Sequence, residues 1–230
     1  MFGAEKIQEL ANVISHLTRQ PMFQIGPVVV TSTVVNTWII MLVLFIAVFF
    51  LTRRFQKQPR GVQTFLEIAL EFINSLIDDG MGRTGRVYLP LVGSLFIMIL
   101  VFNLSWFIPG MVPPTTDIMT TAALGVTSII MIQAAAIRKK GIREYLHHFC
   151  TPMPLLLPMN IVEEVVKPFS LAIRLFGNMF GEKLITNILF ILVPVLVPTP
   201  VMLLGVLMGA IQAYIFSMLT ITYLAEATHD

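Results

Sequence analysis

The feature that most restricts what this chain can fold into is a long segment near its end without charged side chains. From Leu184 to Ala225 the sequence contains no Asp, Glu, Lys or Arg. One crossing of a bilayer needs about 20 mostly apolar residues, so this segment is long enough for two crossings. Pro194, Pro198 and Pro200 lie inside it and indicate a turn between them. Lipid must therefore be part of the solvent of this chain.

The composition of the whole chain also indicates a membrane protein. Of its 230 residues, 56% are hydrophobic and 12% are charged, and the mean hydropathy is +0.84. A soluble domain carries about 25% charged residues. The net charge of +2 is too small to indicate a nucleic-acid partner, and the single Cys150 excludes an intramolecular disulfide or a cysteine metal site. We expect one all-α membrane domain over residues 1–230, without a metal or other cofactor.

Apolar stretches, and the basic residues that end them, locate the crossings. We expect about five membrane-crossing helices, over residues 28–51, 87–108, 118–137, about 155–193 and about 200–225. Basic residues follow the first and the third, at Arg53, Arg54, Lys57 and Arg60 and at Arg138, Lys139, Lys140 and Arg143. These two loops lie on the same side in an alternating topology. The positive-inside rule then places the N-terminus outside and the C-terminus inside.

Residues 62–79 follow a different pattern. Polar side chains recur at three- and four-residue intervals, at Gln63, Glu67, Glu71, Asn74 and Asp78, and apolar side chains occupy the opposite face. This periodicity predicts an amphipathic interfacial helix that ends at Gly80. Because its polar face is acidic, we expect it to contact a partner subunit rather than anionic lipid.

The segment from Asn160 to Asn187 reads as a helix with one polar face. At 100° per residue, six positions lie within about 40° of one line: Glu163, Lys167, Ser170, Arg174, Asn178 and Gly181. Glu182 lies about 80° from Arg174 on the same wheel. An arginine at the bilayer centre costs about 2.5–3.5 kcal/mol on insertion scales and about 10 or more in simulations. The stripe must therefore face protein, water or an opposite charge.

Structural interpretations of this stripe remain open. Glu163 and Lys167 form an ordinary i,i+4 pair, and Arg174 with Glu182 can form a buried structural pair. Lys183, on the opposite side of the helix, is expected to extend to an interface. The functional interpretation is a permanent charge beside a water path, which lowers the pKa of an approaching carboxyl by about 1–3 units. A carboxyl that moved between this arginine and lipid would release and take up a proton, and a partner would have to supply it.

The sequence contains five short motifs: Glu163-Glu164, Lys167-Pro168, the run Arg174-Leu175-Phe176-Gly177-Asn178, Pro114-Thr115-Thr116-Asp117 and Gln212-Ala213-Tyr214-Ile215-Phe216. Together these motifs resemble ATP synthase subunit a. The resemblance covers nearly the whole chain, and the Arg-Leu-Phe-Gly-Asn run is highly specific. It implies a non-catalytic, proton- or sodium-conducting stator subunit. Its partners would be a ring of c subunits, the peripheral-stalk b subunits and the rest of the complex.

The same resemblance implies a mechanism of ion transport and a cellular membrane in which the protein works. Two aqueous half-channels would meet near Arg174, and the last two helices would form a tilted hairpin against the ring. Arg174, Asn178 and Gln212 match the family's ion-translocating residues. The implied location is a bacterial inner membrane, because no transit peptide is recognised, and an organellar energy-transducing membrane is the alternative. The coupling ion depends mainly on the carboxyl site of the c subunit, which another chain carries.

The sequence departs from the family pattern at two positions. Lys183 stands where many members carry a carboxylate, nine residues after the arginine, and Gly205 stands where some place a histidine, seven residues before the glutamine. We therefore assign the ionisable group of the outer half-channel to Glu182, with Gly205 leaving room for it or for water. Further lining residues are expected at Ser170, Glu163, Lys167, Tyr223 and Asp117.

Two other classes of function fit a charged stripe in a membrane protein. A secondary transporter for an organic anion would use Arg174 as a substrate clamp, but the inverted repeats common in transporters are not visible in this sequence. A membrane scaffold would use its buried polar groups to fix helix packing. Replacing Arg174 by alanine separates the ion-conducting role from these alternatives. The ion-conducting role predicts that ATP-driven ion pumping is lost while the complex still assembles.

Overall fold

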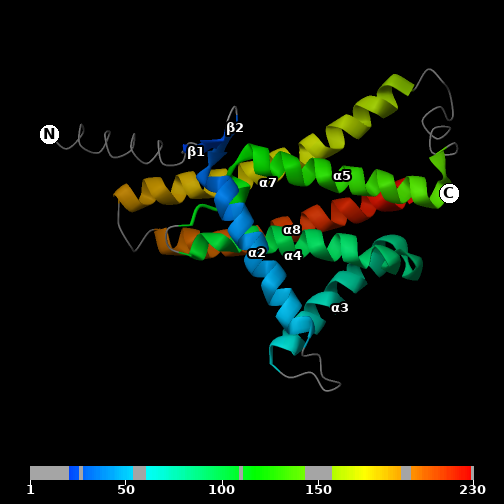
Figure 1. The fold of residues 1–230 in the computed structure, drawn as a ribbon, viewed down its shortest axis with the longest axis horizontal. Coiled ribbons are helices and arrows are strands. Elements are labelled where there is room, and N and C mark those ends of the chain that lie inside the picture. The colour runs from blue at the N-terminus through cyan, green and yellow to red at the C-terminus, as the bar shows by residue number, and fades with distance from the viewer. Residues whose placement is uncertain are drawn as a thin grey trace.

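The computed structural model describes residues 21–25, 28–53, 61–108, 111–142, 157–192 and 198–228. Helices dominate it, as predicted for an all-α membrane protein (Figure 1). The long helices are α2 (Ser32–Thr52), α3 (Val62–Met81), α4 (Leu89–Leu104), α5 (Ile118–Lys140), α7 (Leu157–Leu192) and α8 (Pro198–Thr228). Three 3-10 turns accompany them, η1 (Arg83–Tyr88), η2 (Ser105–Phe107) and η3 (Pro114–Thr116).

The predicted first crossing differs from the structure at its start. Residues Val28–Thr31 form strand β2, which pairs in antiparallel fashion with strand β1, Pro21–Ile25. The run Val-Val-Val-Thr is β-branched throughout, and such residues favour an extended chain. Helix α2 therefore begins at Ser32 rather than at residue 28. The predicted crossing 87–108 is likewise α-helical only from Leu89 to Leu104, with a 3-10 turn at each end.

Helix α5 has clear signals at both ends. The Asp117 side chain caps its N-terminus by accepting a hydrogen bond from the Met119 amide at 3.0 Å. Its last turn carries three basic side chains, which the negative end of the helix dipole favours. Gly141 follows with a φ of 85°, a value that glycine adopts without strain. The helix consequently runs to Lys140, slightly beyond the predicted end at residue 137.

Helix α3 has the amphipathic character that its sequence predicted. Its apolar side chains Ile73, Leu76 and Ile77 are buried, and it packs against α4 and α8. Its acidic side chains Glu67 and Glu71 are exposed. At its end, the Arg86 guanidinium donates hydrogen bonds to Asp78, and this contact holds the pKa of the Asp78 carboxyl below its usual value. The contact of the acidic face with a partner subunit stays a prediction.

The centre of the fold is an antiparallel hairpin of α7 and α8. The two helices are antiparallel because Lys167 contacts Glu226, whereas Asn178, further along α7, contacts Gln212, which is earlier in α8. Helix α5 packs against both α7 and α8, and α4 packs against α8 (Figure 1). The core between them includes Ile99, Phe102, Leu175, Phe216 and Ile221. This packing fixes the faces that α7 and α8 turn towards each other.

Helix α7 changes direction along its length (Figure 1). Pro168 lies inside it, and a proline removes one backbone hydrogen bond and commonly bends a helix. The neighbouring helix approaches very closely at this place. A Cβ atom added to Gly125 of α5 would lie 2.7 Å from the Pro168 carbonyl oxygen, so a larger residue would not fit there.

Within the described ranges, four segments are long and apolar enough to cross a membrane, namely Ser32–Phe50, Arg83–Phe107, Ile118–Lys140 and Pro198–Thr228. Helix α2 is exposed along most of its surface; Trp38, Phe45 and Phe50 are each at least 60% exposed. It crosses the direction of the other long helices in Figure 1. Helix α7 has the length for a crossing but carries the charged stripe, so its crossing, the fifth, remains a prediction.

Candidate functional site

The centre of the α7–α8 hairpin holds a hydrogen-bonded pair of amides. The Asn178 side-chain nitrogen donates to the Gln212 side-chain oxygen at 2.7 Å. Gln212 is 1% exposed, and its own amide nitrogen has no hydrogen-bond partner among the described residues. A buried donor without a partner costs about 1–3 kcal/mol. A water molecule or a neighbouring subunit would remove that cost, so the pair marks a position where a polar group beyond the described residues is needed.

Arg174 lies one helical turn before Asn178 and is exposed on the surface of α7. The structural alternative, a buried pair of Arg174 with Glu182, does not form, because neither Glu182 oxygen has a hydrogen-bond partner among the residues that the structure describes. Phe169 and Ile173 on the same helix are 62% and 58% exposed. A permanent charge is thus set in a largely apolar surface that the described part of the chain does not cover.

Two glycines extend this surface along α7. Cβ atoms added to Gly177 and Gly181 would meet no atom of the described residues within 4 Å, so both positions are open there. Without side chains, they let the backbone of another helix come close. We call Arg174, Gly177 and Gly181 the Arg174 strip. The strip combines a charge with a shallow surface of the kind at which membrane helices pack.

Glu182 turns towards α8 rather than outward with Arg174. Its carboxyl group lies directly against Gly205, and a Cβ atom added at Gly205 would overlap it. Both carboxyl oxygens are buried without a hydrogen-bond partner in the described part of the chain. An isolated carboxylate is too costly to bury in that state, so this group requires a proton, water or a cation. Gly205 supplies the space for the carboxyl group.

Further polar atoms without partners lie near Glu182. Thr186, one turn further along α7, is fully buried, and its hydroxyl has no partner in the described ranges. Asn103 of α4 donates to the Gly209 carbonyl at 3.0 Å, while its own oxygen is unpaired in the described structure. Sequence reasoning missed both residues. A lone asparagine inside an apolar crossing was the available signal, because a side-chain amide in lipid must find a partner.

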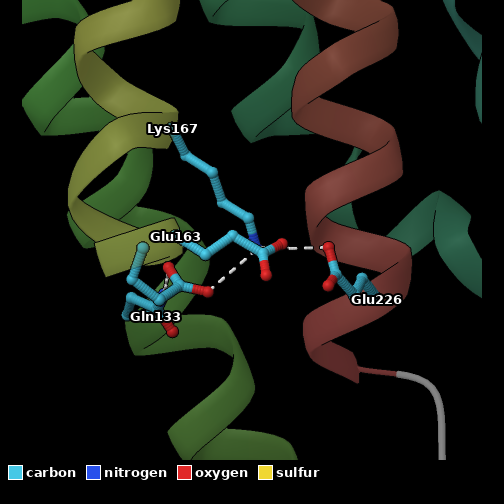
Figure 2. Close-up of polar contacts among 5 residues, drawn as sticks. Gln133, Glu163, Lys167 and Glu226 are labelled. Atoms are coloured by element: carbon cyan, nitrogen blue, oxygen red, sulfur yellow. Dashed lines mark hydrogen bonds and ion pairs between the residues drawn. The ribbon is translucent and has the colours of Figure 1, made fainter. Parts of the chain in front are cut away.

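Lys167 forms the third polar site of the hairpin (Figure 2). Its ammonium nitrogen lies 3.0 Å from a Glu164 oxygen, 3.2 Å from a Glu226 oxygen and 3.6 Å from a Glu163 oxygen. Gln133 of α5 donates to the other Glu164 oxygen. We call these five residues the Lys167 cluster. The cluster ties α5, α7 and α8 together, and its three carboxylates and one ammonium carry a formal charge of −3 + 1 = −2.

The remaining predicted site residues are distributed around these groups. The Tyr223 ring centroid lies 5.2 Å from the Lys167 ammonium, within the range of a cation–π contact. Ser170 is half-buried on α7 between Lys167 and Arg174. Asp117 is 9% exposed and acts as the cap of α5. Its predicted place in a half-channel therefore stays a prediction beside a structural role that the geometry already explains.

The prediction for Lys183 was wrong. This side chain was expected to extend to an interface, but it is 8% exposed. It lies on the side of α7 opposite Arg174, and this is the side on which α7 packs against α5 and η3. Among the described residues, no group of three or more His, Cys, Asp and Glu side chains has the arrangement of a metal site.

Comparison with known proteins gives consistent results over nearly the full length. Residues 34–225 match the family model of the ATP synthase A chain. The chain is 55% identical over 216 residues to ATP synthase subunit a of Moorella thermoacetica, a match covering 94% of this chain and 99% of the relative. It is 37% identical over 239 residues to ATP synthase subunit a of Gloeobacter violaceus, covering 99% and 95% respectively.

Proposed function

This chain belongs to the ATP synthase A chain family, and from that premise we propose that the Arg174 strip faces the ion-binding carboxyls of a c-subunit ring. Membership makes the chain a multi-pass membrane protein and a non-catalytic, ion-translocating subunit of the FO sector. The arrangement of its polar groups supports a division of labour among the Arg174 strip, the surroundings of Glu182 and the Lys167 cluster.

The observation that carries the proposal is the exposure of Arg174 in an apolar surface. A guanidinium stays protonated at every physiological pH, so it cannot escape lipid by losing its charge. The described chain does not offset that charge, and the open space over Gly177 and Gly181 admits another helix. A ring helix with a carboxylate supplies both the missing counter-charge and the missing packing partner.

The chemistry at this contact is a change of environment for the ring carboxyl. Near Arg174 the opposite charge lowers its pKa by about 1–3 units, so it releases its ion to adjacent water. Away from Arg174, facing lipid, the carboxyl must be neutral, because an unpaired charge in hydrocarbon is too costly. Arg174 also repels a proton that would pass directly between the two water paths. Rotation of the ring then couples to ion flow in one direction.

The polar groups of the hairpin support two separate water paths. We assign the outer path to Glu182, with Gly205 as the space beside it, and extend it to Thr186 and Asn103. These residues carry buried polar atoms that have no partner within the described part of the chain, and water would satisfy them. We assign the inner path to the Lys167 cluster with Ser170. The Asn178–Gln212 pair lies between them, next to Arg174 along α7.

Helix lengths support a tilted hairpin. Helices α7 and α8 contain 36 and 31 residues, which corresponds to roughly 54 and 46 Å at 1.5 Å per residue. The hydrocarbon core of a bilayer is about 30 Å thick. A strongly inclined hairpin keeps these lengths in the membrane and lays Arg174 along the side of a ring. The Lys167 cluster at one end would then lie near the interface.

The remaining parts of the proposal concern the partner of α3 and the orientation of the chain in its membrane. The exposed acidic face of α3 is proposed to contact the peripheral-stalk b subunits. The proposed membrane is a bacterial inner membrane, with the N-terminus outside and the C-terminus in the cytoplasm, and an organellar membrane is the alternative. These placements follow from the basic loops and from the family.

The test is Arg174→Ala in the assembled complex, reconstituted in vesicles. We expect ATP-driven ion pumping to fall to background while the complex keeps its full set of subunits. The matched control is Arg53→Ala, which removes an exposed arginine that stacks on Phe49 at the end of α2 and should leave pumping intact. Normal pumping by the Arg174 variant would sink the proposal. Loss of assembly would favour a scaffold, and ring-independent uptake of an organic anion would favour a transporter.

A further inference from the structure

A groove separates α5 from the segment formed by η1 and the start of α4. It has a volume of about 490 Å³, which is within the range of roughly 300–1,000 Å³ that is usual for small-molecule sites. Its walls are mainly apolar, with Val87 and Leu91 on one side and Met131, Ala134 and Ala135 on the other. Tyr88, Arg138 and Lys139 complete its lining. The groove is separate from the polar sites of the α7–α8 hairpin.

The groove exists because of how the helices are held. Helix α8 packs against both α4 and α5, which keeps these two helices in place. Between them, the short side chains of Ala134 and Ala135 leave the space unfilled. Val87 is 79% exposed and Met131 is 46% exposed, so part of the apolar wall is uncovered in this chain. In a bilayer, such a wall is covered by an acyl chain or by another apolar segment.

The charges at the rim select between possible occupants. Arg138 is exposed in the last turn of α5, and its guanidinium can donate two parallel hydrogen bonds to a phosphate. Lys139 is positioned beside it, since its ammonium donates to the Thr228 carbonyl at 2.8 Å. Arg86, the residue before Val87 of the groove wall, is paired with Asp78 at the end of α3. The rim therefore presents positive charge next to an apolar cleft.

We propose that this groove binds one anionic phospholipid, with its phosphate at Arg138 and an acyl chain between α4 and α5. The apolar walls alone give little selectivity, because an acyl chain exchanges one apolar surrounding for another. The head group provides the selectivity, as in other basic pockets between membrane helices. Tyr88 is well placed for this role, since tyrosine favours the level of the lipid head groups. This site is independent of the proposed role of Arg174.

The first test uses the purified full chain and native mass spectrometry, with phosphatidylglycerol and phosphatidylcholine of identical acyl chains. We expect phosphatidylglycerol to be retained about fivefold more, the effect of one basic residue at a membrane surface. Arg138→Gln should abolish this preference. The control Lys140→Gln removes the same charge from the same helical turn but outside the groove lining, and it should keep the preference. Equal retention of both lipids by the unmodified chain, or equal loss in both variants, would overturn the proposal.

Two further measurements separate the lipid from other occupants. Ala134→Leu fills the groove without changing its charge and should reduce retention of both lipids, whereas unchanged retention would place the lipid elsewhere. Glycerol 3-phosphate in excess should leave the lipid bound, and displacement by it would show a phosphate site without an acyl chain. A photo-reactive side chain at position Val87 in the assembled complex should crosslink to phospholipid. A crosslink to a polypeptide instead would show that a protein helix fills the groove.

Discussion

The contact between Glu182 and Gly205 allows a sharp test of how α7 and α8 fit together. We consider Gly205→Ala, which adds one methyl group where the Glu182 carboxyl lies. The added carbon would overlap that carboxyl, so the side chain must rotate away or the helices must separate. Overpacking of this kind costs about 1–3 kcal/mol. The carboxyl would also leave the place that we assign to the outer water path.

The size of the effect can be isolated with a matched variant. Alanine is a better helix former than glycine by about 0.5–1 kcal/mol, which partly offsets the clash. Gly93→Ala measures this gain alone, because a Cβ atom at buried Gly93 of α4 would make one ordinary contact of 3.8 Å with Ile73. The difference between the two variants should then be about 1–3 kcal/mol. This corresponds to a change in Tm of about 2–12 °C for a chain of this size.

Two assays are needed, because a clash and a lost ion path are different effects. Thermal denaturation of the purified chain reports the clash, and passive ion flow through the membrane sector in vesicles reports the path. Gly205→Ala should lower both Tm and flow. Adding Glu182→Ala removes the carboxyl, so the double variant should recover Tm but not flow. If Gly205→Ala matches Gly93→Ala in both assays, Glu182 does not occupy the space beside Gly205 and the reasoning fails.

Substitutions at three other places test separate parts of the site. Asp117→Ala should lower the free energy of unfolding by about 1 kcal/mol through loss of the α5 cap, while Asp117→Asn should keep the cap; reduced ion flow in the asparagine variant would indicate a role for the charge. Lys167→Met should destabilise the chain and loosen α7 from α8, because the carboxylates of its cluster would repel one another; unchanged crosslinking between the helices would contradict this. Asn178→Leu and Gln212→Leu should each lower Tm, and the double variant should lower it by less than the sum; additive effects would mean that the two amides are not coupled.

The helical framework was predictable because its signals are local. The periodic polar and apolar positions in residues 62–79 indicated α3, and Ile73, Leu76 and Ile77 on its apolar face are buried as that pattern requires, while Phe72 stays partly exposed. Basic residues after residue 137 indicated the end of α5. The β-hairpin was not predictable in the same way. A short apolar run such as Val28–Thr31 fits either a helix or a strand, and its pairing with Pro21–Ile25 decided the outcome.

The contacts of the site were harder to predict because they join distant residues. The i,i+4 pair of Glu163 and Lys167 followed from helix geometry, but Glu226 is 59 positions from Lys167 and comes close only in the folded hairpin. The same holds for Asn103 and the Gly209 carbonyl, 106 positions apart. For Lys183, the sequence-based prediction was wrong because burial also depends on packing between helices. Its long side chain and its position opposite Arg174 indicated an interface, but the packing of α7 buried it.

The change in direction of α7 has a geometrical consequence (Figure 1). A straight rod laid across a cylinder touches it near one point, whereas a rod that curves with the cylinder stays in contact over more of its length. Pro168 lies just before the Arg174 strip, so the portion of α7 that carries the strip can take a direction different from that of the portion before it. The portion after Pro168 buries Leu171 and Leu175 within this chain and leaves Arg174 exposed, so its direction would also set how closely the strip follows the ring that we propose as its partner.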